Sequence, residues 1–266
     1  MIVCAKQVPD PEGPASSFRV DREARRVIPQ GISPVINPFD ENALEAALRI
    51  KDRLDAGVTV LTMGETVALP IMRKALAAGA DKLVVLTESL FKDLDSHSVA
   101  CVLAASIKKL GPFDIILFGR QAGDWDFGVT GPYVADMLEV PMVSLARRVE
   151  IEDGSVLVEQ LCEGGYKVVK SPMPSLVTVS SEIGELRYPN VRALVDAKKK
   201  PVTILNGADI GLDLQNLKRR PTHDLIAFEP ARQCTFAEGE SLEEKIGNLV
   251  DLLKGDRIIS SRLRGA

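Results

Sequence analysis

The chain has 266 residues, of which 45% are hydrophobic and 26% charged, as is typical of a soluble globular protein with one large or two small domains. Its formal net charge of −4 argues against a nucleic-acid-binding surface, while four cysteines without a C-x-x-C pair and two histidines outside metal-binding motifs predict reduced thiols and no metal site. No apolar run approaches the ~20 residues of a membrane span, and a strand pattern beginning at Met1 leaves no room for a signal peptide, so we expect a cytoplasmic protein.

Short apolar runs alternate with helical patterns in the first half of the chain. We expect strands at residues 1–5, 58–63, 82–87 and 114–118, a hairpin of residues 18–20 and 26–28, and helices from residue 37, residue 66 and Ser96 or Ser98. Asn37 suits an N-cap, Pro38 the first helical position and Asp40 the positive helix end. This alternation predicts a doubly wound, mostly parallel α/β sheet. The loops after the first, second and fourth strands should then meet the helix start at Asn37 on one rim.

The stretch of residues 118–141, FGRQAGDWDFGVTGPYVADMLEVP, follows the fourth strand and leads into a helix. A glycine-bearing turn of this kind places free backbone N–H groups at the positive end of the helix dipole, where phosphate binds well. The stretch has neither the GxGxxG nor the GxxxxGKS/T pattern. It therefore indicates either a nucleotide site or an ordinary strand-to-helix turn whose glycines serve only backbone geometry.

The second half of the chain changes character. Residues 143–151, 156–162, 166–170 and 175–180 are β-type runs that predict an antiparallel extension of the same sheet. Residues 186–197 are partly helical, and Lys198, Lys199 and Lys200 form a solvated face or helix end. Residues 219–239 lack periodicity and are expected to lie on a partner, before a capping box at Ser241 opens a final helix. We expect an α/β nucleotide-binding domain at residues 1–205 and a C-terminal arm at residues 206–266.

Several motifs occur together in a fixed order. They are VCAKQVPD at residues 3–10, NPFD at 37–40, GRQA at 119–122, RYP at 187–189 and AKKK at 197–200. With them the chain resembles the β subunit of an electron-transfer flavoprotein, from residue 1 to about residue 214. The resemblance implies a fold like that of the adenine-nucleotide α-hydrolases and an obligate α subunit whose FAD exchanges electrons with dehydrogenases. The β subunit of this family holds AMP or, in the electron-bifurcating branch, a second FAD.

The resemblance also implies which residues bind the nucleotide. Backbone N–H groups of residues 127–131 and the Thr130 hydroxyl would hold phosphate, and Cys4, Ala5 and Met63 would contact adenine. The full set of implied cofactor-binding residues is Cys4, Ala5, Asn37, Pro38, Phe39, Asp40, Met63, Asp124, Trp125, Asp126, Phe127, Gly128, Val129, Thr130, Gly131, Pro132, Tyr133, Val134 and Ala135.

The loop DWDFGVTGP departs from both family types, which resemble DGDTAQVGP with FAD and DDDxNxTGQ with AMP. Pro132 agrees with the FAD type and Thr130 with the AMP type, while Phe127 and Val129 replace polar residues. Trp125 could cover a flavin or adenine ring, or belong to the core or an interface. We expect FAD in this site, with AMP as the alternative.

Residues 185–200 match the recognition loop of the family, which inserts an apolar residue into a partner dehydrogenase. Leu186 stands where proline is usual, and Val191 where the anchoring leucine is usual. The implied partner-binding residues are Arg187, Tyr188, Val191 and Arg192. Alternatively, Val191 packs within its own chain.

The expected function is that of an electron-carrier subunit without catalytic residues of its own. It would pass electrons between an acyl-CoA-type or other dehydrogenase and a redox acceptor, with bifurcation from NADH if its own site holds FAD. A second hypothesis is an AMP-binding structural or regulatory subunit without a redox centre. A stand-alone nucleotide hydrolase is disfavoured, because the sequence has no Ser/Cys–His pair and no SGGxDS loop.

Overall fold

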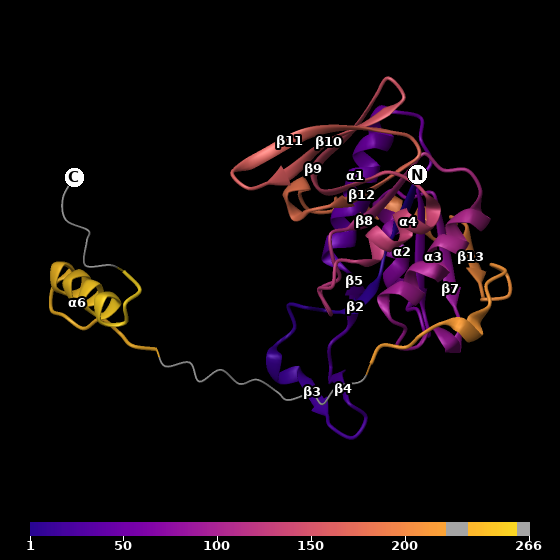
Figure 1. The fold of residues 1–266 in the computed structure, drawn as a ribbon. Helices are drawn as coiled ribbons and strands as arrows, with labels where there is room; N and C mark the ends of the chain where they lie inside the picture. The colour runs from indigo at the N-terminus through magenta and orange to yellow at the C-terminus, as the bar shows by residue number, and fades with distance from the viewer. Residues whose placement is uncertain (222–233, 260–266) are drawn as a thin grey trace. The chain divides into compact units, whose positions relative to one another are not determined.

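A mixed sheet forms the centre of the first of two units (Figure 1). The computed structural model describes residues 1–221 and 234–259, and the units are Met1–Leu225 and Ile226–Ala266. In the described residues this sheet has nine strands in the order β11-β10-β9-β12-β8-β1-β6-β7-β13. In chain order their bounds are β1 Ile2–Cys4, β6 Thr59–Gly64, β7 Lys82–Thr87, β8 Ile115–Gly119, β9 Met142–Glu152, β10 Ser155–Cys162, β11 Gly165–Pro172, β12 Ser175–Val179 and β13 Val202–Leu205.

The strands from β12 to β13 are parallel, whereas β9, β10 and β11 form the predicted antiparallel extension at the opposite end of the sheet from β13. The prediction that residues 175–180 belong to that extension is wrong. β12 pairs in parallel with both β8 and β9 and is buried throughout, so both its edges lie inside the sheet. A five-residue buried run carries no alternation that would distinguish the two arrangements. The edge strand β13 was not predicted.

Helices cover both faces of the sheet, which confirms the doubly wound α/β fold. Their bounds are α1 Pro38–Arg53, α2 Leu69–Ala78, α3 Ser96–Leu110, α4 Thr130–Leu138 and α5 Val191–Ala197. Alternation along β1 shows the two sides: Val3 packs with residues of α1 and α2, whereas Ile2 and Cys4 pack with residues of α3 and α4. The core is therefore two apolar layers separated by the sheet.

Two helix starts differ from expectation. α2 begins at Leu69 rather than near residue 66, with a proline at its second position. α3 begins at Ser96, but its N-cap is Asp95, whose carboxylate accepts a hydrogen bond from the Ser98 amide at 2.7 Å. Asp is as good an N-cap as Ser, but Asp95 was not among the residues predicted for this role.

Two small two-stranded sheets lie outside the main one. β2 (Gln7–Pro9) pairs with β5 (Pro34–Ile36), and the predicted hairpin forms from β3 (Phe18–Asp21) and β4 (Arg26–Pro29). Single 3₁₀ turns occur at Ala15–Ser17, Ser89–Phe91, Ser181–Ile183 and Leu214–Asn216.

The second unit contains α6 (Leu242–Gly255), which begins with the predicted capping box between Ser241 and Glu244. The structure divides the chain after Leu225, whereas we predicted a boundary after residue 205. Residues 222–233 of the predicted partner-binding tail lie outside the described residues. In the described ranges, no helix combines the length and apolar character that crossing a membrane requires.

Candidate functional site

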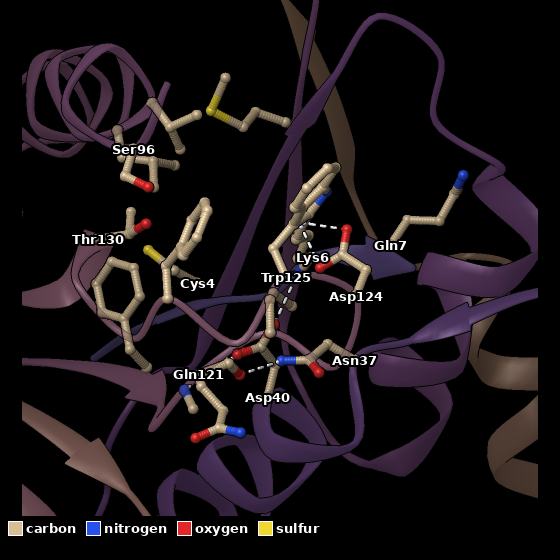
Figure 2. Close-up of a pocket in the computed structure, with 18 of the residues that line it drawn as sticks. Cys4, Lys6, Gln7, Asn37, Asp40, Ser96, Gln121, Asp124, Trp125 and Thr130 are labelled. Carbon is tan, nitrogen blue, oxygen red and sulfur yellow. Dashed lines mark hydrogen bonds and ion pairs between the residues drawn. The ribbon is translucent and has the colours of Figure 1, made fainter. Parts of the chain in front are cut away.

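A cavity of about 310 Å³ opens at the carboxyl ends of β1, β6 and β8 (Figure 2). Carboxyl ends of parallel strands meet at one edge of an open α/β sheet, which is where such folds bind ligands. The structure brings eleven of the expected cofactor-binding residues to this cavity: Cys4, Ala5, Asn37, Asp40, Met63, Asp124, Trp125, Phe127, Gly128, Thr130 and Gly131.

Asn37 and Asp40 connect the loops around the cavity. Asn37 occupies the N-cap position of α1, but its side chain makes no capping bond, contrary to expectation. Its Nδ2 donates to the carbonyl of Gln121 at 2.8 Å, and its Oδ1 accepts from the amide of Gly123 at 3.0 Å. The Asp40 carboxylate accepts from the amides of Lys6 at 2.7 Å and Gly119 at 3.0 Å. Two side chains from one helix start therefore hold the loops after β1 and β8 in place.

Gly119 allows the end of β8 to lie close to the start of α1. A Cβ at this position would lie 2.5 Å from the Phe39 carbonyl carbon and 2.6 Å from Oδ1 of Asp40. No side chain fits there without moving α1, so glycine is required at the end of β8.

Burial shifts the ionisation of two cavity residues. Desolvation raises the pKa of Asp40 to about 6, although the hydrogen bonds from the Lys6 and Gly119 amides act in the opposite direction. Burial, with Asp40 nearby, also raises the pKa of the Cys4 thiol well above its usual range. Cys4 is therefore a neutral, weakly polar part of the cavity wall near pH 7.

The N-terminus of α4 presents free backbone donors. Within the described part of the chain, the amides of residues 127–131 have no hydrogen-bond acceptor. Gly128 has φ +64, a conformation that L side chains rarely adopt, and Gly131 lies so close to β12 that a Cβ would be 3.1 Å from Cγ2 of Thr178. Free amides at the positive end of a helix are suited to an anionic ligand.

Lys6 and Arg120, two cationic residues, line the same cavity. Lys6 Nζ pairs with Asp124 at 2.6 Å (Figure 2), and the Arg120 guanidinium lies 4.6 Å from the centre of the Phe39 ring. Nε of Arg120 is buried without a hydrogen-bond partner among the described residues. Both cations sit in the AKQ and GRQ motifs directly after strands, which was the available signal for them. The lining residues that sequence reasoning missed are Lys6, Gln7, Leu61, Gly64, Thr66, Phe91, Asp93, Leu94, Ser96, Val99, Leu103, Phe118, Gly119, Arg120, Gln121, Ala122 and Arg220.

The other expected cofactor-binding residues do not line the cavity. They are Pro38, Phe39, Asp126, Val129, Pro132, Tyr133, Val134 and Ala135. α4 directs Val134 and Ala135 into the core beside α3, and the Tyr133 ring packs edge-on against His97 with centroids 5.6 Å apart. Asp126 accepts a hydrogen bond from the Gln121 side chain at 2.8 Å.

Trp125 is half-exposed and belongs to an aromatic pair. Its ring lies 6.0 Å from that of Phe127, with 28° between the two planes, and the exposed fractions are 46% and 56%. The interpretation of Trp125 as a core residue is therefore wrong. Two aromatic surfaces remain at the edge of the cavity, immediately before α4.

The segment before and within α5 exposes apolar side chains. Val191 is 78% exposed, which contradicts packing within its own chain, and Tyr188 and Arg192 are exposed as well. Arg187 differs, because its guanidinium donates to both carboxylate oxygens of Glu45 at 3.0 and 3.1 Å and pairs with Asp52 at 2.8 Å. Arg187 thus fixes this segment to α1.

No group of three or more His, Cys, Asp or Glu side chains suited to a metal ion occurs in residues 1–221 and 234–259. The arrangement that the structure does show is a cavity with an apolar wall, free amides and cations. Such a site suits an anionic ligand with an apolar ring.

Comparison with known proteins identifies the family of this chain. Residues 26–210 match the family model described as "Electron transfer flavoprotein domain". The caffeyl-CoA reductase-Etf complex subunit CarD of Acetobacterium woodii is 37% identical over 264 residues, covering 97% of this chain and 99% of that protein. The electron transfer flavoprotein subunit beta of Thermoanaerobacterium thermosaccharolyticum is 36% identical, with coverage of 97% and 99%. The acryloyl-CoA reductase electron transfer subunit gamma of Anaerotignum propionicum is 32% identical, with coverage of 97% and 98%. The chain therefore belongs to the electron-transfer flavoprotein β-subunit family.

Proposed function

We propose that this chain is the nucleotide-binding β subunit of a heterodimeric electron-transfer flavoprotein and that its cavity holds FAD. It would carry electrons between a dehydrogenase and a redox acceptor, and with FAD in its own site it would bifurcate electrons from NADH. The relatives that are named as parts of caffeyl-CoA and acryloyl-CoA reductase systems favour an acyl-CoA-type partner. Four free cysteines suit the reducing environment of the cytoplasm.

The observation that carries the proposal is the set of free amides in front of α4. These donors are open to an acceptor, and the phosphates of a nucleotide supply one while also interacting favourably with the positive helix end. Arg120, whose Nε has no partner among the described residues, adds a positive charge to the same cavity. The apolar wall formed by Leu61, Met63 and Phe91 provides a surface for an adenine ring.

The aromatic pair favours FAD over AMP. AMP ends at the phosphate, whereas FAD continues through a second phosphate to an isoalloxazine ring, which when bound accepts and returns electrons. Trp125 and Phe127 offer exposed ring surfaces beside the amides, where that continuation needs apolar contact. Phe127 provides no hydroxyl for the second phosphate, but backbone amides bind pyrophosphate without one.

AMP in a structural or regulatory site is the second candidate. Thr130 supports it, because this residue matches the AMP-bearing loop type and its side chain lies at the cavity (Figure 2).

The α subunit is the expected partner of the C-terminal region. α6 exposes Leu242, Ile246 and Leu249, which recur at helical spacing on one side of the helix. Within its own unit the described part of α6 has no buried residue, so this apolar side is left for another surface to cover.

The test is to purify the chain with its α subunit, denature the complex and quantify released nucleotides by chromatography. We expect two FAD per heterodimer for the native pair. Gly128→Val should remove one FAD and leave the α-subunit flavin bound, because Val cannot adopt φ +64 without strain. Gly154→Val is the matched control, since Gly154 has φ +71 in the distant β9–β10 turn.

One FAD with one AMP would overturn the choice of FAD and of bifurcation. One FAD with no further nucleotide would overturn the site itself. Equal nucleotide loss in the Gly154→Val complex would show that general destabilisation, and not the cavity, explains the Gly128→Val result.

A further inference from the structure

Lys218 and Arg220 are hydrogen-bonded to the loop in front of α3. The Lys218 carbonyl accepts from the amide of Asp95 at 3.0 Å, and the Lys218 amide donates to the hydroxyl of Ser98 at 2.7 Å. The Arg220 amide donates to the Asp93 carbonyl at 2.8 Å. Backbone hydrogen bonds therefore hold this segment beside the cavity, and the Arg219 side chain adds a bond to the Lys92 carbonyl.

The side chain of Arg220 links two walls of the cavity. Its guanidinium pairs with the Asp93 carboxylate at 3.2 Å and lies 4.0 Å from the centre of the Trp125 ring. Asp93 precedes α3, whereas Trp125 belongs to the loop between β8 and α4. All three residues line the cavity, and the half-exposed Trp125 places the contact at its solvent-facing edge.

One donor of Arg220 is left over. Its Nε is buried without a hydrogen-bond partner among the described residues. A buried donor without an acceptor is costly, so an anionic oxygen of a ligand in the cavity would be stabilised there. The Arg220 side chain thus contacts the Trp125 ring and keeps one hydrogen-bond donor, Nε, free for a ligand.

We propose that Arg220 retains the bound nucleotide by closing the cavity against Trp125, an inference that rests on the proposed nucleotide site. A ligand leaving through this edge must separate the guanidinium from the indole ring. Asp93 and the backbone bonds hold Arg220 in this position against the Trp125 ring. Arg220 is a ligand-retaining residue, and the nucleotide stays bound as a slowly released group.

The experiment measures nucleotide release from the purified heterodimer. Complexes loaded with FAD, or in parallel with AMP, are diluted into nucleotide-free buffer, and free nucleotide is separated by filtration and quantified over time. The variants are Arg220→Ala, Arg220→Lys, Trp125→Ala and Trp125→Phe, together with the double variant Arg220→Ala/Trp125→Ala. Arg22→Ala, in the exposed turn between β3 and β4, is the matched arginine control.

We expect about tenfold faster release from the two single alanine variants, as loss of a partly desolvated cation–π contact allows. In the AMP-loaded complexes, where Trp125 has no flavin ring to contact, the double variant should release nucleotide no faster than Arg220→Ala, because that substitution already breaks the contact with Trp125. Lys and Phe should give intermediate rates, and thermal unfolding of the nucleotide-free complexes should not change.

Release within twofold of the native rate in both alanine variants would overturn the retention proposal. Multiplied effects in the AMP-loaded double variant, or faster release only in step with lost thermal stability, would overturn it as well. In these cases native binding persists, so the proposed function stands. A native heterodimer that binds neither FAD nor AMP in this site would overturn both.

Discussion

Replacing Asp40 with asparagine should remove a pH-dependent part of this protein's stability. The Asp40 carboxyl is buried at the start of α1, and burial raises its pKa from the ordinary 3.8 to about 6. The folded state therefore binds more protons than the unfolded state between these two values. The free energy of unfolding must fall as pH rises through this window, because the charged form is the disfavoured one in the fold.

The size of the effect follows from the two pKa values. The contribution of Asp40 to the free energy of unfolding is fully present below pH 3.8 and is lost above pH 6. Between pH 4.5 and pH 7.5 it amounts to about 2 kcal/mol of unfolding free energy. Asparagine has a single acceptor oxygen, so one of the amides of Lys6 and Gly119 loses its partner at every pH, at a cost of about 1–3 kcal/mol. That constant cost does not affect the difference between two pH values.

Urea unfolding of the heterodimer at pH 4.5 and pH 7.5 measures the difference, at fixed protein concentration because subunit binding contributes to apparent stability. Relative to the native complex, Asp40→Asn should be about 2 kcal/mol less stable at pH 4.5 than at pH 7.5, beyond its constant cost. Asp55→Asn, at an exposed position after α1, is the control for loss of a carboxylate. Parallel pH profiles of the native and Asp40→Asn complexes would refute the reasoning.

Two further predictions concern the segment before and within α5. Val191→Ala should weaken association with the partner dehydrogenase by about 1–2 kcal/mol without changing the bound nucleotide. The substrate dependence of steady-state electron transfer measures this change, and Val27→Ala, at another exposed valine, is the control. Unchanged coupling would exclude Val191 as the anchor. Glu45→Ala should destabilise the fold by about 1–2 kcal/mol in urea unfolding, because the one-third-exposed Arg187 loses two charge-assisted hydrogen bonds but keeps Asp52. Asp52→Ala, which removes the exposed partner of Arg187, should cost less than about 1 kcal/mol, and equal losses would contradict this account.

The alternating part of the fold was predictable because strand and helix signals repeat at regular spacing. Helices on both faces of β1 and a shared rim at its carboxyl end follow from that alternation, and residues such as Cys4, Asn37 and Gly128 reach one cavity as expected. Strand direction was harder to predict. The five residues of β12 do not themselves show the direction of the strand, and only long-range pairing with β8 and β9 makes β12 parallel.

Side-chain partners were the least predictable feature. Asn37 stands at the N-cap position that local sequence indicates, but its side chain bonds to the loop at Gln121 and Gly123. Local propensity describes what a residue can do for its own helix, and it carries no information about a loop more than eighty residues away in the chain. In the same way the sequence did not indicate that Arg187 pairs with Glu45 and Asp52 of its own chain, and its contact with a partner stays a prediction.

Trp125 shows how a departure from a family pattern can depend on a second residue. A half-exposed tryptophan in place of glycine or aspartate would leave an apolar ring in water at the edge of a cavity. In the structure one cation, Arg220, lies over that ring, and Phe127 packs beside it. Arg220 can take this position only because residues 218–220 are hydrogen-bonded in front of α3, so the tryptophan depends on a segment that leaves the main sheet after β13. The sequence type of the loop alone therefore cannot determine which nucleotide binds, because two distant parts of the chain form the surface that contacts the ligand.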